Sequence, residues 1–104
     1  MFGFRKRHNE STYRIFHKAF KYFQRTQSND DRLTEDENFF VNLLLFVTIG
    51  GEQIVSNWHD FMHDDKTIAY CVQNAYEDAG YTADEFVFYQ QKFSPMIKNS
   101  LQSI

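Results

Sequence analysis

Two histidines, His59 and His63, stand four residues apart in the segment HDFMH. On a helix this spacing turns both imidazoles the same way, as in zinc enzymes that carry a glutamate between the two ligands. Here the residue after the first histidine is Asp60, whose shorter side chain departs from that motif. Glu52 shares the face of His59, but no second cluster of cysteines, histidines and acids accompanies them. We therefore expect a solvated helix flank and predict no metal ion and no other cofactor, with metal binding by the two histidines as the open alternative.

The other residue types that do chemistry are not arranged for catalysis. Cys71 is expected in the middle of a helix beside its apolar stripe, where a buried, inert thiol is the usual outcome. Gly50 and Gly51 lack the lysine and the spacing of a phosphate-binding loop. The carboxylates form no isolated pair of the kind that general acid–base chemistry needs. The sequence therefore predicts no catalytic residue, and we expect a protein that is not an enzyme.

The composition predicts one domain over residues 1–104. A chain of 104 residues is the size of a single domain, and its aromatic residues, 18% of the total, each bury a large area. A single cysteine excludes a disulfide within the chain and favours a reducing compartment. The basic residues near the N-terminus are not followed by the apolar stretch of a signal peptide. The longest apolar run, residues 39–49, is about half of the ~20 residues that span a bilayer. We expect a cytoplasmic protein.

Helical periodicity and capping patterns cover most of the chain. Capping boxes, in which a threonine and a glutamate three residues later satisfy each other's backbone donors, begin at Thr34 and Thr82. The pair Gly50-Gly51 should break the second helix, Gly80 should follow the end of the fourth, and Pro95 should kink or end the fifth. The predicted helices cover residues 11 or 12 to 27, 34 to 49, 52 to 63, 64 or 65 to 79, 82 to 94, and a last short segment over 97–104.

These patterns predict an all-α fold, a compact bundle of five or six helices. Residues 1–10 precede the first predicted helix and could be flexible. The second helix is apolar on every side and should sit at the centre of the core. A buried strand over residues 41–49 is the weaker alternative, because the cap before it favours a helix.

The charge is divided unevenly along the chain. Residues 1–32 hold eight basic and three acidic residues, a net +5, and residues 33–104 hold three basic and eleven acidic residues, a net −8. In the first helix, Arg14, Lys18, Lys21 and Arg25 recur at i, i+4, i+7 and i+11 and form a narrow basic stripe. Such a stripe could lie on an anionic membrane or contact nucleic acid phosphates. A solvated face, partly neutralised by nearby carboxylates, is the simpler interpretation.

Acidic residues gather in the second half of the chain. Residues 52–85 carry eight of them against Lys66 alone, a net −7. Such a surface repels nucleic acid and attracts a basic protein, and aromatic side chains among the charges could serve as anchors. The candidate partner-binding residues are Trp58, Asp60, Asp64, Asp65, Tyr70, Tyr76, Glu77 and Asp78. Helix capping and solubility are the alternative explanation, which accounts less well for Asp60, Glu77 and Asp78.

In overall character the chain resembles the small helical immunity proteins that bacteria make against secreted toxins, including those of contact-dependent growth inhibition. The shared features are size, acidity, cysteine usage and the lack of a catalytic site. The resemblance implies a non-enzymatic inhibitor that binds a cognate toxin domain, typically a basic nuclease, and blocks its active site or substrate surface. A phage-encoded inhibitor would share these features.

The expected partner is therefore a protein, with neither nucleic acid nor a membrane, and a homodimer is compatible with the sequence. The alternative function is a peripheral membrane or nucleic-acid-binding module that uses the basic first helix.

Overall fold

Helices make up most of the part of the chain that the structure, a computed structural model, describes. This part comprises residues 2–27, 29–55, 58 and 65–102, with side chains described at 11–27, 29–55, 58 and 66–99. No strand occurs among these residues, so the predicted all-α class is confirmed. The helices are α1 (Phe2–Thr26), α2 (Glu35–Leu45), α3 (Gly51–Ile54), α5 (Asp65–Asp78) and α6 (Ala83–Gln102), and a π-helical segment, η1 (Phe46–Gly50), joins α2 to α3. None of the described helices is long and apolar enough to cross a membrane.

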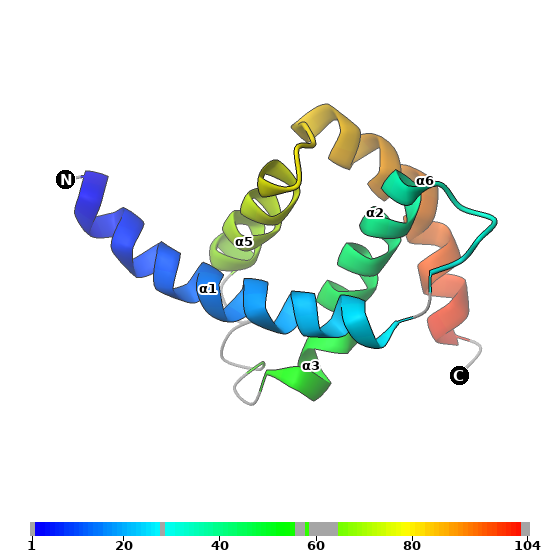
Figure 1. Cartoon of the computed structure of the whole chain (residues 1–104), viewed down its shortest axis with the longest axis horizontal. Coiled ribbons are helices and arrows are strands. Elements are labelled where there is room, and N and C mark those ends of the chain that lie inside the picture. Colours follow the sequence, from blue (N-terminus) through cyan, green and yellow to red (C-terminus); the bar gives the residue numbers. More distant parts are fainter. Residues whose placement is uncertain (1, 28, 56–57, 59–64, 103–104) are drawn as a thin grey trace.

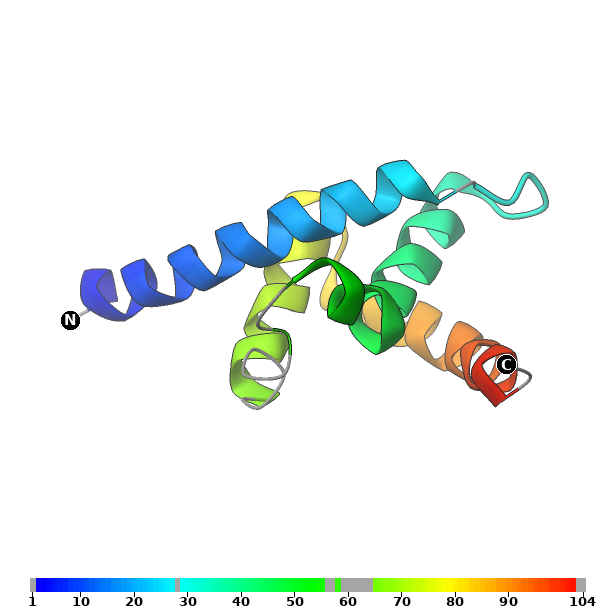
Figure 2. The ribbon, with the colours of Figure 1, turned by 90° about the horizontal axis from the view of Figure 1, so that it is seen from below.

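Helix α1 is long and packs against α2, η1, α3 and α5. Figure 1 and Figure 2 show it lying across the other helices, with its N-terminal part extending beyond them. Helix α2 lies between α1 and α6 (Figure 2), and α5 packs against α1. Helices α5 and α6 spread apart from a common corner at Gly80, with α2 between them (Figure 1).

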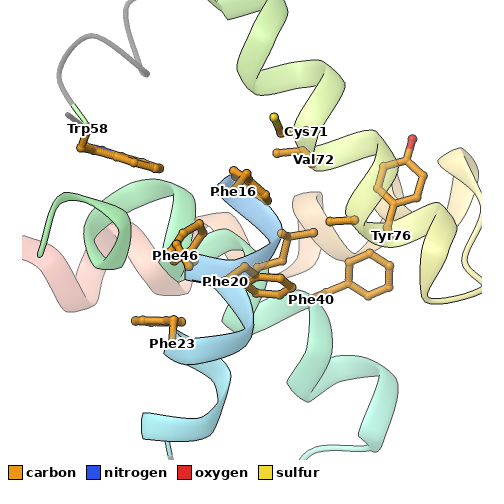
Figure 3. Packing of buried hydrophobic residues seen from close by; sticks show 12 residues of the cluster. Phe16, Phe20, Phe23, Phe40, Phe46, Trp58, Cys71, Val72 and Tyr76 are labelled. Carbon is orange, nitrogen blue, oxygen red and sulfur yellow. The ribbon is translucent and has the colours of Figure 1, made fainter. Parts of the chain in front are cut away.

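Phe46 is the centre of the core on the α1 side (Figure 3). Its ring is fully buried and lies 5.1, 5.5 and 5.6 Å, centroid to centroid, from the rings of three α1 phenylalanines, Phe16, Phe20 and Phe23. The Trp58 ring packs edge-on against Phe46 at 5.5 Å. Aromatic pairs at these separations each contribute about 0.5–1.5 kcal/mol beyond the area they bury. The helices α1 and η1 are therefore joined mainly through this one ring.

Phe40 joins α2 to α6 on the other side. Its ring is also fully buried, and its centroid lies 4.8 Å from that of Tyr81 and 4.7 Å from that of Tyr89. Phe40 and Phe46 stand six residues apart, so the two aromatic clusters occupy different faces and different turns of the same helical segment. The expectation that this segment sits at the centre of the core agrees with its position between α1 and α6.

The helix boundaries predicted from local chemistry are confirmed where caps set them. In the first capping box the Thr34 N–H donates to Glu37 Oε1 at 2.9 Å, and the Glu37 N–H donates to Thr34 Oγ1 at 3.1 Å. Thr82 and Glu85 make the same reciprocal pair before α6. Gly80 ends α5 with a φ of 94°, in the left-handed conformation that terminates many helices.

The described residues form four continuous helical segments, fewer than the five or six helices expected. In the described part of the chain, α2, η1 and α3 follow one another without interruption, and α6 continues through Pro95 to Gln102. The predicted last short helix is therefore the end of α6. Proline in an interior turn removes one backbone donor without necessarily ending the helix.

The predicted start of the first helix and the predicted continuity of the helix over residues 52–63 were also wrong. Helix α1 begins at Phe2 rather than at residue 11 or 12, because residues 4–10 contain no glycine or proline that would stop it. The helix expected over residues 52–63 is interrupted after Ile54, where Val55 adopts an extended conformation, and Trp58 is again helical. Residues 56–57 and 59–63 of that predicted helix lie outside the described part.

Gly50 and Gly51 do not break the helix, contrary to the sequence prediction. Both adopt right-handed helical angles, with φ of −70° and −62°. A Cβ at Gly50 would collide with the Phe23 ring, and a Cβ at Gly51 would collide with the Trp58 ring. The two glycines are therefore required for close approach between the backbone and these rings.

Replacing Gly50 with alanine tests this explanation, because crowding and helix propensity act in opposite directions. Alanine in an uncrowded helix stabilises by about 0.5–1 kcal/mol. Here the collision with Phe23 should dominate, and we expect Gly50→Ala to lower the free energy of unfolding by about 1–3 kcal/mol. Urea unfolding followed by circular dichroism measures the change, with the exposed Thr48→Ala as a control expected within about 0.5 kcal/mol of wild type. A stabilised Gly50→Ala variant would contradict the close-approach explanation.

Candidate functional site

Three helix ends meet at the corner between α5 and α6. The Tyr81 hydroxyl, in the connection after Gly80, donates to Asp36 Oδ1 at 2.5 Å and so draws the start of α2 to this corner. The Tyr13 hydroxyl, on α1, donates to Asp78 Oδ2 at 2.6 Å at the end of α5. Two tyrosine–carboxylate hydrogen bonds thus connect α1 to α5, and the connection between α5 and α6 to α2.

This corner carries a group of carboxylates that we call the acidic end. It consists of Glu35, Asp36, Glu77, Asp78, Asp84 and Glu85, of which Glu85 is half-buried and the others are exposed. Within the described residues, none of the six lies within 4.0 Å of a lysine or arginine nitrogen. The nearby carboxylate of Glu37 is paired with Lys92, at 2.6 Å between Oε2 and Nζ. The acidic end therefore presents its negative charge to solvent.

The two tyrosines stay protonated in this setting. Burial and the adjacent carboxylate of Asp78 raise the pKa of Tyr13 well above its usual value. Burial and the carboxylate of Asp36 do the same to the pKa of Tyr81. Both hydroxyls consequently remain hydrogen-bond donors at neutral pH.

Local structure explains some of the acidic end but not all of it. Glu85 caps α6, and negative charge at the start of α2 and α6 is favoured by the helix dipole. Glu77 lies in the last turn of α5, where the dipole disfavours an acid. The only hydrogen bond that its side chain makes within the described residues comes from Gln73 Nε2, at 3.1 Å. Glu77 therefore has the weakest structural explanation of the six.

The structure brings together only part of the predicted binding residues. Glu77 and Asp78 lie at the acidic end. Asp65 begins α5 at the opposite end of that helix, about 20 Å away at 1.5 Å per residue, so it does not join them. Asp60 and Asp64 lie outside the described residues. Glu35 and Asp36 were missed, because nothing local in the sequence indicates that Tyr81 bonds to a residue 45 positions away.

Two of the predicted aromatic anchors belong to the core. The side chains of Trp58 and Tyr76 are each only 6% exposed, packed against Phe46 and Phe86 respectively. Tyr70 is half-buried against the same core. The large exposed aromatic ring near the acidic end is instead Phe88, which is 58% exposed on the first turns of α6. It lies four residues after Asp84, and so on the same face of the helix.

The basic stripe of α1 forms a second charged surface. Arg14, Lys18, Lys21 and Arg25 are exposed as predicted, and none of them makes an ion pair with a carboxylate in the described part of the chain. The predicted partial neutralisation is therefore not seen there. Ile15 and Tyr22, both about half exposed, lie along this stripe and line a shallow hollow with α3 and Val55.

Within the described residues, the side chains that could do chemistry form no cluster. His59 and His63 lie outside the described residues, and Glu52 is exposed on α3. Where the structure describes the chain, no three residues among histidine, cysteine, aspartate and glutamate are grouped as metal ligands would be. Cys71 is fully buried on α5, and burial raises the pKa of its thiol to about 12.

Comparison of the chain with protein-family models, with curated proteins and with solved structures finds no match. The function must therefore be argued from these surfaces.

The burial of Cys71 makes its reactivity a measure of opening of the fold. The free thiol should react with Ellman's reagent at mildly alkaline pH only when α5 opens, because the native thiol is both inaccessible and protonated. We expect the native reaction to be at least about a thousandfold slower than in denaturant, since a stability of about 5 kcal/mol keeps the open fraction below that level. The exposed control Gln91→Cys, in a Cys71→Ala background, should react at once. A native Cys71 reacting at the rate of the control would refute its placement.

Proposed function

We propose that this chain is a non-enzymatic inhibitor in the cytoplasm that binds a basic protein, most specifically an immunity protein that neutralises a cognate toxin domain. The observation that supports it is the acidic end, where separate helix ends hold six carboxylates with no cation paired to them in the described residues. Among the described residues, this charge carries no ion pair that a partner would first have to break.

The composition of this surface suits a basic protein partner. Negative potential on one side speeds the diffusional encounter with a positively charged domain and repels competing nucleic acid. Interfaces also need a large side chain that is desolvated on binding. Phe88, exposed one turn after Asp84, provides such an anchor beside the charges, in place of the buried Trp58 and Tyr76.

Inhibition follows from the chemistry that a nuclease needs. A nuclease binds phosphates with lysine and arginine side chains, and carboxylates of an inhibitor compete for the same cations. An acidic end seated on that surface would exclude the substrate by charge and by volume, without any catalytic group on the inhibitor.

Charge reversal at the acidic end tests this function. Tagged wild-type protein, recovered from its native cells, should retain one basic protein in stoichiometric amount through moderate salt. The variant Glu77→Lys/Asp84→Lys should retain about tenfold less or lower, because two attractive charges become repulsive. Neither carboxylate bonds to a backbone group or a tyrosine among the described residues, so we expect the fold to persist.

The matched control is Asp31→Lys/Glu52→Lys, which reverses two equally exposed acids elsewhere on the molecule. It should retain the partner as wild type does. The purified partner should lose its toxic or enzymatic activity at an equimolar amount of wild-type protein. Equal retention by the two double variants, or recovery of lipid or nucleic acid alone, would contradict the proposal.

A second candidate function is supported by the unpaired basic stripe with Ile15 and Tyr22 beside it. Cations and exposed apolar side chains on one helical face are typical of helices that lie on anionic membranes, and of surfaces that bind nucleic acid.

Reversing the stripe separates the two candidates. Under the inhibitor proposal, Arg14→Glu/Lys18→Glu/Lys21→Glu/Arg25→Glu should change retention of the basic protein by less than about twofold, because these side chains lie on a different face of α1 from Tyr13, the residue that contacts the acidic end. Under the alternative, wild-type protein should sediment with phosphatidylserine vesicles or shift a DNA duplex, and the variant should lose that binding.

A further inference from the structure

A hollow of about 580 Å³ lies between α5 and α6, beside the acidic end. Its floor is formed by α2 and η1, including Leu44, Val47 and Thr48. Ile68 and Tyr76 contribute to the α5 wall, and Gln90 to the α6 wall. Its volume is within the range of about 300–1,000 Å³ that is typical of binding sites.

The hollow exists because α5 and α6 diverge. At the corner the Tyr76 and Phe86 rings stack with centroids 5.0 Å apart and close one end of the hollow. Away from the corner the two helices spread to either side of α2 (Figure 1), and apolar side chains of both helices line the hollow. The result is a groove with an apolar floor between two helical walls.

Charged side chains lie at the rim and in the lining of the groove. At the closed end, Gln73 lines the groove and donates to Glu77 of the acidic end at 3.1 Å, so that carboxylate lies at the rim. Glu85 precedes Phe86, which lines the other side of the same end. Among the described residues that line the groove, the only charged one is Lys98, twelve residues further along α6 than Phe86. Negative charge of the described residues therefore lies at the rim of the closed end.

We propose that this groove binds an amphipathic helix of the basic partner, with its apolar stripe against α2 and its lysine and arginine side chains at the acidic end. The inference rests on the proposed function and adds the form of the partner segment. An apolar groove between two helices is a common receptor for a third helix, whose apolar side chains at i, i+3, i+4 and i+7 fill it. The charge of the rim at the closed end selects a basic helix over an acidic one.

The polar side chains of the walls fit this occupant. Gln73 on α5, and Gln90 and Ser94 on α6, lie along the two sides of the groove and can hydrogen-bond the polar edges of a bound helix. Polar groups around an apolar centre are the usual arrangement of a protein interface.

A synthetic amphipathic helix of leucine and lysine, with all leucines on one face, serves as the probe. We expect it to bind the full chain, as measured by fluorescence anisotropy. A peptide of the same composition with scattered leucines should bind about tenfold more weakly or worse, because it presents no apolar stripe. A leucine–glutamate counterpart should likewise bind at least about tenfold more weakly, because the acidic end repels it.

Filling the groove provides the matched pair of variants. Gln90 and Gln91 are both exposed on α6, but only Gln90 lines the groove. Gln90→Trp should weaken binding of the leucine–lysine peptide by about tenfold or more, and Gln91→Trp should leave it within about twofold of wild type. Equal binding by the two variants, or by the scattered peptide, would overturn the inference. So would an apolar small molecule, such as a fluorescent fatty acid, that enters the groove and is excluded by Gln90→Trp while the peptide is not.

These experiments distinguish failure of the groove inference from failure of the proposed function. If Glu77→Lys/Asp84→Lys loses the native basic partner while Gln90→Trp retains it and binds the peptide as wild type does, the groove inference fails and the inhibitor proposal stands. If the peptide result is as expected but no basic partner is recovered from cells, the inhibitor proposal fails and the groove remains a receptor for basic amphipathic helices.

Discussion

The fold depends on one helical segment, α2 continued by η1, that buries an aromatic ring on each side. Phe46 packs among three phenylalanines of α1, and Phe40 packs against Tyr81 and Tyr89. Loss of a ring at such a position costs about 3–5 kcal/mol, a large part of the stability of a small domain. Helices α1 and α6 do not depend on direct contact with each other, because each is held by α2 or η1. The acidic end and the groove exist only while that central segment keeps its place.

The features that were predicted correctly from the sequence are those that depend on only a few neighbouring residues. The capping boxes at Thr34 and Thr82 and the glycine turn at Gly80 are local hydrogen-bonding patterns, and all three were confirmed. The prediction for Gly50 and Gly51 was wrong, because a glycine pair looks the same in the sequence whether it breaks a helix or lets an aromatic ring pack against the helix backbone. Only the packing of Phe23 and Trp58 distinguishes these cases, and both rings come from other parts of the chain.

The candidate site illustrates the same limit. The excess of acids in residues 52–85 is visible in the sequence, and Glu77 and Asp78 were identified from it. The contribution of α2 depends on the hydrogen bond between Tyr81 and Asp36, which spans 45 positions, and no spacing rule predicts it. Trp58 and Tyr76 failed as anchors for a related reason. Aromatic residues among charges can face either the core or the solvent, and here the core contains both.

The turn at Gly80 has a consequence for how such a protein could diversify. The turn contains the only backbone position with positive φ in the described residues, and the angle between α5 and α6 originates there. A Cβ at Gly80 would meet no atom within 4 Å, so the conformation of this one residue, and not crowding, sets the geometry. Substitutions at Gly80 would therefore alter the separation of the two helices while leaving the aromatic cluster around Phe46 intact, whereas changes at the neighbouring Tyr81 would also disturb the cluster around Phe40. Chains with the same core could in this way have grooves of different width.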